Sequence, residues 1–189
     1  KKGEMYVGMD HLEAVVEIKN IIDKSFIKRI KPFIDKRATE SLPVISGEDK
    51  SVRNVKGYHI GFKNPTDVFY WNYIKLEIQR LYPYYKMKFP RMESMKINQI
   101  DLLKYSPGGK YELHTDNHTF TPRILSVIMN LNDDYTGGDL IFGDQQNKEI
   151  KRLKLTEGSI VFFPSNFLYP HSIQPITKGK RYSIVAWLQ

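Results

Sequence analysis

Hydrophobic positions recur with two different periods along the chain, and the change falls near residue 96. Before that point, Val15–Ile22 is rich in β-branched residues, which favour a short strand. A helix is expected after Asp23, a typical N-cap, because the following apolar residues share one helical face: Phe26, Ile27, Ile30, Phe33 and Ile34. Pro32 inside this pattern predicts a kink or an early end of the helix.

A second helix is predicted after Asn64-Pro65-Thr66-Asp67, a typical start signal. Its apolar residues also recur at helical spacing, and they are Val68, Trp71, Ile74, Ile78 and Leu81. Pro83 is expected to end it. Residues 38–58, between the two helices, are polar and lack a sustained period, so they predict a long mobile loop, of the kind that acts as a lid or is disordered.

After residue 96 the pattern becomes that of short strands separated by Gly- and Pro-containing turns. Eight strands are expected, at Ile97–Tyr105, Tyr111–Thr115, Arg123–Leu131, Asp139–Phe142, Ile150–Leu155, Ser159–Phe163, His171–Pro175 and Arg181–Leu188. Eight short strands in under a hundred residues are typical of a double-stranded β-helix, that is, a jelly-roll or cupin-like barrel. We therefore expect a mainly β fold with N-terminal helices that support one sheet.

The domain organisation follows from this change of period. The sequence predicts a single catalytic domain over 1–189, with a strand and helix support at 1–95 and the β-helix core at 96–189. Its 189 residues, 41% of them hydrophobic, suffice for one globular core. No run of eighteen apolar residues is present, so no membrane span is expected.

The chain contains no cysteine, which excludes disulfides, thiolate zinc sites, iron–sulfur clusters and cysteine nucleophiles. Any bound metal must therefore be held by His, Asp or Glu. The segment Lys1–Met5 has no apolar h-region, and together with the lack of cysteine this predicts an intracellular, cytoplasmic protein.

A net charge of +8 raises the question of a nucleic-acid partner. The basic excess is uneven, however, because residues 101–150 carry 4 basic and 8 acidic groups, whereas 51–100 carry 9 and 3. This distribution favours a rim that receives an acidic or peptide partner over a nucleic-acid footprint. The oligomeric state is left open.

The strand region contains the pattern His-x-Asp at His114 and Asp116. Residues two apart on a strand point to the same side, so these side chains can converge. His171 begins a later strand, and two His with one carboxylate on a β-scaffold form the facial triad of non-haem Fe(II) oxygenases. Taken alone, the His-x-Asp spacing is also compatible with polar residues at a strand end.

Arg181 follows His171 by ten residues, after a predicted turn. In a hairpin it would lie on the neighbouring antiparallel strand, beneath the metal, where its planar guanidinium could bind a carboxylate. Trp187 lies six residues further on, so it shares the facing of Arg181 and could wall the same pocket.

At these residues the chain resembles the prolyl 4-hydroxylase-like family of Fe(II)/2-oxoglutarate-dependent dioxygenases. The resemblance covers roughly half of the chain and rests on Tyr105-Ser-Pro-Gly-Gly-Lys-Tyr111-Glu-Leu-His114-Thr-Asp116, Arg123, Leu131-Asn132, Tyr135-Thr136-Gly137-Gly138, Glu157-Gly158, Phe162-Phe163-Pro164-Ser165, His171, Pro175, Gly179, Arg181 and Trp187.

The resemblance implies His114, Asp116 and His171 as iron ligands and Arg181 as the partner of the distal carboxylate of 2-oxoglutarate. Tyr105 matches a tyrosine that hydrogen-bonds this co-substrate. The implied cofactors are Fe(II), 2-oxoglutarate and O2, with ascorbate as a candidate reductant.

Two further residues are candidates for contacting the substrate. Arg53 in the long loop matches a substrate-loop arginine of the family. Tyr111 would lie on the face of a regular strand opposite to His114, so core packing and a contact at the rim of the site stay open for it.

The function that the resemblance implies is hydroxylation of a C–H bond, with decarboxylation of 2-oxoglutarate to succinate. A prolyl or other residue of a peptide or protein is the favoured substrate, because the loop at 38–58 is long enough to fold over an extended chain. The alternatives are hydroxylation of a free amino acid or small molecule, and a β-barrel that binds without turnover. Nucleic-acid demethylation fits less well, because Arg181 alone matches the expected pattern of co-substrate arginines.

Overall fold

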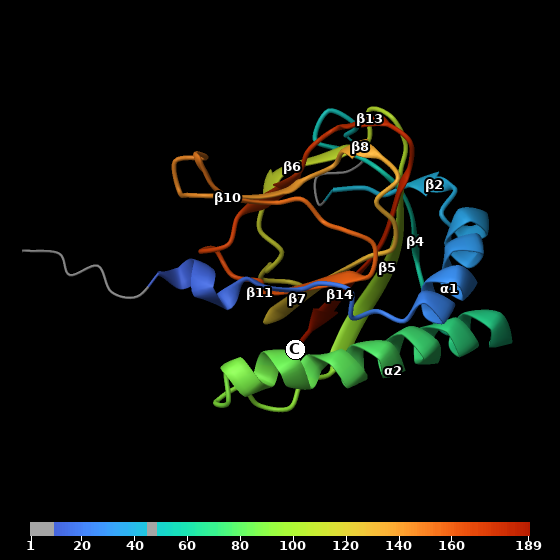
Figure 1. Cartoon of the computed structure of the whole chain (residues 1–189), viewed down its shortest axis with the longest axis horizontal. Coiled ribbons are helices and arrows are strands. Elements are labelled where there is room, and N and C mark those ends of the chain that lie inside the picture. The colour runs from blue at the N-terminus through green and yellow to red at the C-terminus, as the bar shows by residue number, and fades with distance from the viewer. Residues whose placement is uncertain (1–9, 45–48) are drawn as a thin grey trace, which may run out of the picture.

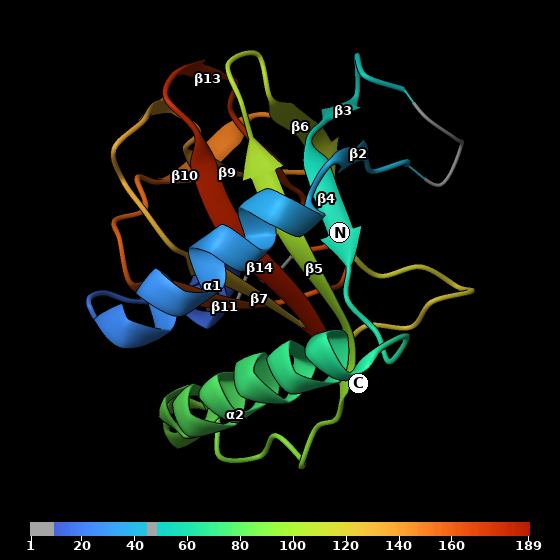
Figure 2. The same cartoon turned by 90° about the vertical axis from the view of Figure 1, so that its right-hand side faces the viewer.

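The structure is a computed structural model that describes residues 10–44 and 49–189. The segment Lys1–Met5 and residues 45–48 of the predicted loop lie outside the described residues. After a short 3-10 turn at His11–Ala14, two helices and fourteen strands follow in the described part of the chain. Figures 1 and 2 show two helices on one side of a large sheet, with a second sheet beyond it.

Helix α1 spans Lys24–Arg37 and α2 spans Pro65–Lys88. Both begin as predicted, with the side chains of Asp23 and Asn64 capping backbone N–H groups of the first turn. Neither α1 nor α2, the α-helices of the described residues, is long and apolar enough to cross a membrane.

The prediction that Pro83 ends the second helix is wrong, and of the two alternatives for Pro32, a kink or an early end, the early end does not occur. Pro32 lies inside α1, and α2 continues past Pro83 to Lys88. Each proline is on the exposed side of its helix, whereas Phe33 and Tyr85, just beyond them, are buried. Burial on both sides of the proline outweighs one lost backbone hydrogen bond.

The larger sheet has seven strands in the order β1-β11-β7-β14-β5-β4-β2, with antiparallel pairing throughout. Its strands are β1 (Val16–Ile18), β2 (Glu40–Ser41), β4 (Lys56–His59), β5 (Ile97–Tyr105), β7 (Leu125–Asn130), β11 (Ser159–Pro164) and β14 (Arg181–Leu188). The β5 and β14 bounds match the predicted ones, whereas the strand expected at Val15–Ile22 is only three residues long.

The smaller sheet has five strands in the order β10-β9-β12-β6-β3. Its strands are β3 (Arg53–Asn54), β6 (Lys110–His114), β9 (Leu140–Gly143), β10 (Glu149–Leu153) and β12 (His171–Ile173). A third pair, β8 (Thr136–Gly137) with β13 (Ile176–Lys178), was not predicted. The seven-stranded and five-stranded sheets face each other, each with antiparallel pairing, in the jelly-roll arrangement that the sequence predicts (Figure 1).

The region 38–58 differs from the single long loop that its composition predicts. It contributes β2 and β4 to the edge of the large sheet and β3 to the edge of the small one. Backbone pairing with β5 and β6 stabilises these strands, and such pairing leaves no periodic signal in a short polar segment.

The large sheet separates two hydrophobic clusters. On its outer face, α1 and α2 cover a core that includes Ile34, Ile74 and Ile184. Between the two sheets lies a second cluster, which includes Leu103, Phe142 and Phe163. The prediction that the helices cover one sheet is therefore confirmed, and the second cluster surrounds the candidate site.

Candidate metal and co-substrate site

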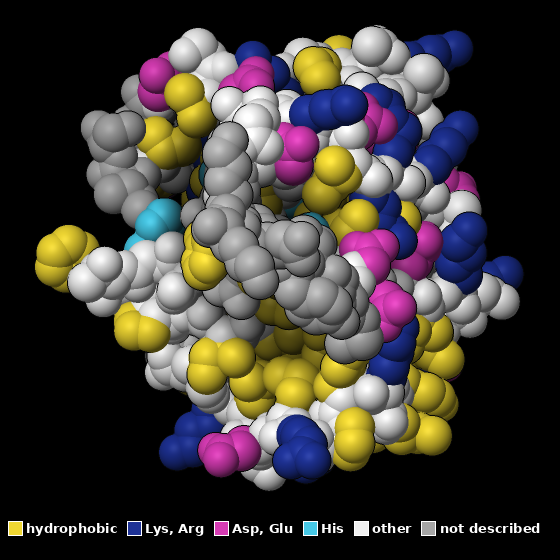
Figure 3. Space-filling model, turned by 90° about the vertical axis from the view of Figure 1, so that its left-hand side faces the viewer, with side chains coloured by type: hydrophobic (Ala, Val, Ile, Leu, Met, Phe, Trp, Pro, Cys, Tyr) yellow, Lys and Arg dark blue, Asp and Glu magenta, His cyan; other side chains and the backbone are white. Residues whose placement is uncertain are grey.

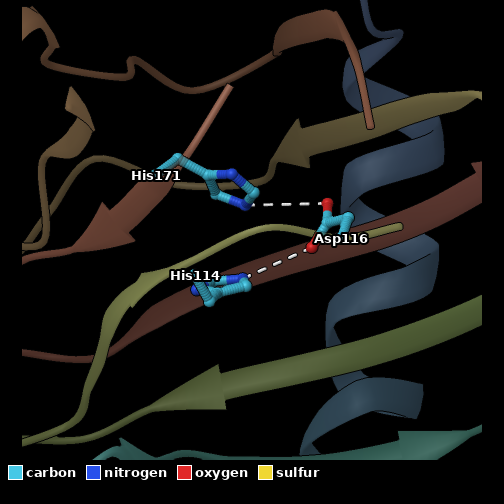
Figure 4. Close-up of side chains that lie close together, drawn as sticks. All are labelled: His114, Asp116 and His171. Atoms are coloured by element: carbon cyan, nitrogen blue, oxygen red, sulfur yellow. Dashed lines mark ion pairs between the residues drawn. The ribbon is translucent and has the colours of Figure 1, made fainter. Parts of the chain in front are cut away.

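Two His and one Asp converge between the sheets (Figure 4). The Nε2 atom of His114 lies 3.3 Å from Oδ1 of Asp116, and Nε2 of His171 lies 3.6 Å from Oδ2 of Asp116. One donor atom from each residue lies within 4.8 Å of the others. His114 ends β6 and His171 begins β12, and these residues are directly paired across the two strands.

Asp116 lies two residues beyond the end of β6 and not on the strand itself. The side chains of His114 and Asp116 therefore converge because the chain turns after β6, and not only because residues two apart on a strand share a face. Asp116 is buried, and its Oδ2 accepts a hydrogen bond of 2.7 Å from Ser126 Oγ. Ser126 Oγ is in turn 2.7 Å from Ser165 Oγ, so two hydroxyl groups fix the carboxylate.

Both imidazole rings are oriented by the backbone. Nδ1 of His114 lies 2.8 Å from the carbonyl oxygen of Glu112, and Nδ1 of His171 lies 3.0 Å from that of Tyr169. A carbonyl can only accept, so each Nδ1 carries the proton and donates it. Each Nε2 lone pair then points toward Asp116, which is the tautomer that a metal ligand requires.

The electrostatics of the site favour ligands without protons. Burial alone would raise the pKa of Asp116, but His171, His114 and the Ser126 hydroxyl together hold that pKa well below its usual range. Burial lowers the pKa of His171 to about 4. At neutral pH the cluster therefore presents a carboxylate and a neutral His171 imidazole to the same point, which fits a divalent metal with a two-His, one-carboxylate ligand set.

Arg181 lies in the same cavity, although not where the hairpin prediction places it. Its strand β14 pairs with β5 and β7 in the large sheet, whereas β12, which carries His171, pairs with β6 and β9 in the small one. Arg181 and His171 thus approach from facing sheets. The chain crosses between the sheets through β13, which was not predicted.

The Arg181 side chain is almost fully buried, and its Nε donates to Oδ1 of Asn130 over 3.0 Å. Its Nη2 atom is buried and has no hydrogen-bond partner among the described residues. A buried guanidinium with an unused donor is costly unless a ligand pairs with it. The arrangement fits the carboxylate of a co-substrate that lies between Arg181 and the metal ligands.

The cavity between the sheets is lined by residues of both sheets. Alternate residues of β14 line it, so Trp187 shares the facing of Arg181 as predicted. Tyr105, on β5, lies opposite Arg181 in the β5–β14 pairing, and its ring centroid is 5.2 Å from the guanidinium carbon. Ser183, whose buried Oγ has no hydrogen-bond partner in the described chain, also faces the cavity and was missed. The period of two counted from Arg181 would have found it.

Tyr111 lies on the same side as His114 because β6 is irregular. Between His171 and Ile173 the paired residue moves three positions, from His114 to Tyr111, which marks a β-bulge. The Tyr111 ring stacks on His114 with centroids 3.5 Å apart. The guanidinium carbon of Arg53, on β3, lies 4.6 Å from the centroid of the Tyr111 ring. The rim alternative for Tyr111 therefore agrees with the structure, and Arg53 lies beside it.

A wider hollow forms the mouth of the site, and its lining residues include Arg53, Tyr111, Arg123 and Trp187. The Arg123 guanidinium carbon lies 3.7 Å from the centroid of the Trp187 indole. Its Nη1 donates to the backbone oxygen of Asp116 over 3.2 Å. Arg123 is part of the family resemblance but had no predicted role, because its proximity to Trp187 depends on pairing between distant strands.

Two facing antiparallel sheets with a two-His, one-carboxylate cluster and a buried arginine between them define a jelly-roll protein with a candidate mononuclear metal centre. Residues 100–189 match the model of the 2OG-Fe(II) oxygenase superfamily. This match covers just under half of the chain and, together with the relatives and solved structures below, supports a prolyl 4-hydroxylase-like 2OG-Fe(II) oxygenase.

Curated relatives agree with this assignment. A PKHD-type hydroxylase of Prochlorococcus marinus is 36% identical over 98 residues, which are 50% of this chain and 42% of that protein. The PKHD-type hydroxylase PiuC of Pseudomonas aeruginosa is 33% identical over 95 residues, which are 45% of this chain and 40% of PiuC. The matched region thus spans less than half of each of these relatives.

Solved structures share the fold over nearly the whole chain. A prolyl-4-hydroxylase of Pseudomonas putida has a TM-score of 0.69 at 18% identity, covering 93% of this chain and 92% of that one. A prolyl hydroxylase of Trichoplax adhaerens, solved with a peptide fragment of the hypoxia inducible factor oxygen degradation domain, has a TM-score of 0.75 at 19% identity. This alignment covers 94% of this chain and 85% of the Trichoplax chain. At these identities the likeness establishes the fold.

Proposed function

We propose that this chain is an Fe(II)- and 2-oxoglutarate-dependent dioxygenase that hydroxylates a C–H bond, most suitably of a prolyl or other residue in a peptide or protein. The observation that carries the proposal is the pairing, in one cavity, of a metal-ligating triad with the buried and partly unpaired guanidinium of Arg181. A metal site alone would not need this cation, whereas a dicarboxylate that bridges from the metal would.

Each residue of the site has a separate task in this proposal. His114, Asp116 and His171 would hold the metal, with the imidazole orientations fixed by the backbone carbonyls. Arg181 would bind the distal carboxylate of 2-oxoglutarate, and Tyr105 would contribute to the same pocket. Phe142 and Phe163 pack around His171 and would keep bulk water from the metal.

The bound cofactors supply the oxidising chemistry, in which 2-oxoglutarate and O2 yield succinate, carbon dioxide and a hydroxylated product. Asp116 keeps the third ligand position, which favours hydroxylation over halogenation. Ascorbate as a reductant stays a prediction from the family resemblance.

A macromolecular substrate is supported by the lining of the mouth. This hollow reaches His114 and Asp116 of the triad, and two arginine–aromatic pairs line it: Arg53 with Tyr111 and Arg123 with Trp187. Guanidinium groups beside flat aromatic surfaces suit peptide carbonyls and a cyclic side chain. The Trichoplax neighbour is a prolyl hydroxylase with a bound peptide, which is consistent with this choice.

The decisive test is succinate formation by the chain with Fe(II), 2-oxoglutarate and a library of proline-containing peptides, followed by mass spectrometry for a gain of one oxygen atom. We expect turnover by the parent protein and none by His114→Ala or Arg181→Ala. Gln174→Ala, on the outer side of the small sheet, serves as the control. Equal turnover in all four proteins would contradict the proposal.

The same screen tests the alternatives. Hydroxylation of free proline or another small molecule, with no modified peptide, would favour a small-molecule hydroxylase. A barrel that binds without turnover would take up neither metal nor 2-oxoglutarate in a titration. On the face of the molecule in Figure 3, Lys and Arg side chains are interspersed with Asp and Glu, which gives no support there to a nucleic-acid substrate.

A further inference from the structure

A chain of hydrogen bonds runs along the mouth of the site, next to the residues that contact the metal. It begins at His59 on β4 and Asp101 on β5, which are direct cross-strand partners. His59 Nδ1 lies 3.0 Å from Asp101 Oδ1. It continues through Gln99 to Arg123. None of these contacts is needed to hold the metal or the co-substrate.

The contacts of Gln99 fix which way its amide faces. Its Nε2 donates to both carboxylate oxygens of Asp101, over 3.0 and 3.2 Å. Its Oε1 is therefore turned toward Arg123, whose Nη2 donates to it over 3.1 Å. In the flipped orientation the amide nitrogen would face a guanidinium that can only donate. Asp101 thus selects the orientation of Gln99 that accepts from Arg123.

Asp101 is itself buried, and its carboxylate also meets the ring of His59. The His59 side chain, which is largely exposed, supplies the third hydrogen bond. This hydrogen bond with Asp101 raises the pKa of His59, whereas its partial burial and the nearby Lys63 and Arg123 act in the opposite direction.

Arg123 is held by two hydrogen bonds that point in different directions. Nη1 donates to the backbone oxygen of Asp116 and Nη2 to Oε1 of Gln99, so the guanidinium is held over the Trp187 ring. Without Gln99, one hydrogen bond would remain and the side chain could turn away from the indole. A long side chain that must otherwise be ordered on binding costs affinity.

We propose that Gln99, held in one orientation by Asp101, is a positioning residue that keeps the Arg123 guanidinium over Trp187 and thereby sets the affinity for the substrate and not that for 2-oxoglutarate. The inference rests on the proposed function, because Arg123 matters in this way only if a substrate binds at the mouth. Gln99 and Asp101 act through Arg123 and do not themselves reach the metal ligands.

The test uses the full chain and compares Gln99→Met, which removes both hydrogen-bonding ends at similar length, with Asp101→Asn, which frees the Gln99 amide to flip. The first readout is the fluorescence of Trp187 in a Trp71→Phe background, since Trp71 and Trp187 are the two tryptophans. We expect a shifted emission and stronger acrylamide quenching in both variants. This readout does not depend on turnover, so it tests the positioning of Arg123 over Trp187 even if no peptide is hydroxylated.

The second readout is kinetic and uses any peptide that the library screen identifies. We expect the KM for the peptide to rise about tenfold, as for the loss of a hydrogen bond to a charged group, while the dissociation constant of 2-oxoglutarate stays the same.

The chain provides matched controls. The side chains of Gln174 and Asp139 both accept hydrogen bonds from Arg152. Arg152 is on β10 of the small sheet, whereas Trp187 is on β14 of the large sheet. Gln174→Met and Asp139→Asn should leave the Trp187 emission unchanged. The inference is overturned if Gln99→Met or Asp101→Asn leaves the emission unchanged, if the controls shift it equally, or if the affinity for 2-oxoglutarate falls together with that for the peptide.

Discussion

Arg181 illustrates how one buried group can be costly to the free protein and useful to the complex. It is the largest of the fully buried side chains, and one of its donors is unpaired. Proteins rarely tolerate such a group without a reason, because desolvating a cation is expensive. The carboxylate of a co-substrate would supply both the missing charge and the missing acceptor.

Replacing Arg181 with Met should therefore affect binding more than folding. We expect the affinity for 2-oxoglutarate to fall by about 1.5–3 kcal/mol, or roughly 10- to 150-fold. Isothermal titration calorimetry with Mn(II) in place of Fe(II) would measure it. Arg152→Met, which removes an exposed arginine from its ion pairs with Glu149 and Asp139, should not change this affinity.

His171 gives the metal-free protein a pH-dependent stability. Its pKa is about 4 in the folded chain, below the usual 6.5, because of burial. Between these values the unfolded chain binds more protons than the folded one, so stability falls as the pH drops from about 6.5 to 4. The loss should reach about 3 kcal/mol, and chemical denaturation at a series of pH values would detect it.

His171→Gln should flatten this dependence, while His11→Gln, at an exposed histidine, should leave it unchanged. The lowered pKa of Asp116 has the same sign and acts at lower pH: its contribution is present above the ordinary carboxyl pKa and is lost below it. A stability that rises on acidification would contradict this description of the site.

At the scale of single elements, β5 and β14 could be located from sequence because each alternates regularly between the two cores and is bounded by clear turns. The pair β8 and β13 could not, since each is two or three residues long and owes its form to the other. The helices began where their caps indicated but did not end at proline, because buried residues such as Tyr85 hold the last turns in place.

Pro83 is therefore expected to destabilise α2 slightly. It lies on an exposed position inside the helix, where an alanine would restore a backbone hydrogen bond. Pro83→Ala should raise the free energy of unfolding by about 2 kcal/mol, allowing for the greater freedom of the unfolded alanine chain. Urea denaturation would measure this change, and a destabilised variant would indicate that the proline has a packing role.

The candidate site was predictable in its chemistry but not in its assembly. The His-x-Asp pattern, His171 and Arg181 are residues that the structure brings to one cavity, yet Arg181 approaches His171 from the opposite sheet and not from the next strand. The roles of Arg123 and Gln99 were missed because only the pairing of β5, β7 and β14 brings these residues to Trp187. Such contacts depend on strand register, which local spacing cannot specify.

At the scale of the whole molecule, the large sheet separates the hydrophobic core under the helices from the cavity that holds the candidate site. The helix-side core contains most of the fully buried aliphatic residues, and the cavity lies on the other face. Changes on the helix side should thus alter the free energy of unfolding without altering the site of those molecules that remain folded.

Ile74→Ala, in α2, tests this separation. The side chain is fully buried, so the loss of its packing should cost about 2–5 kcal/mol in unfolding free energy. At a temperature well below the transition, the affinity for 2-oxoglutarate should equal that of the parent protein. Leu76→Ala, at an exposed position of the same helix, should change stability by less than about 0.5 kcal/mol.

The alternation along β14 has a consequence for how this chain can change by insertion and deletion. Arg181, Ser183 and Trp187 face the cavity, while Ile184 and Leu188 belong to the helix-side core. Gaining or losing one residue within the strand would exchange these two sets at once, placing a guanidinium among aliphatic side chains and an isoleucine in the ligand pocket.

The turn before β14 fixes which residues of the strand face the cavity. Gly179 has φ of +79°, and a Cβ there would lie 2.7 Å from the backbone oxygen of Asp134. Insertions and deletions are therefore not expected in β14 or in the turn before it. The Asp144–Asn147 turn, whose residues are exposed or half-exposed, can lengthen without moving a residue of the candidate metal site.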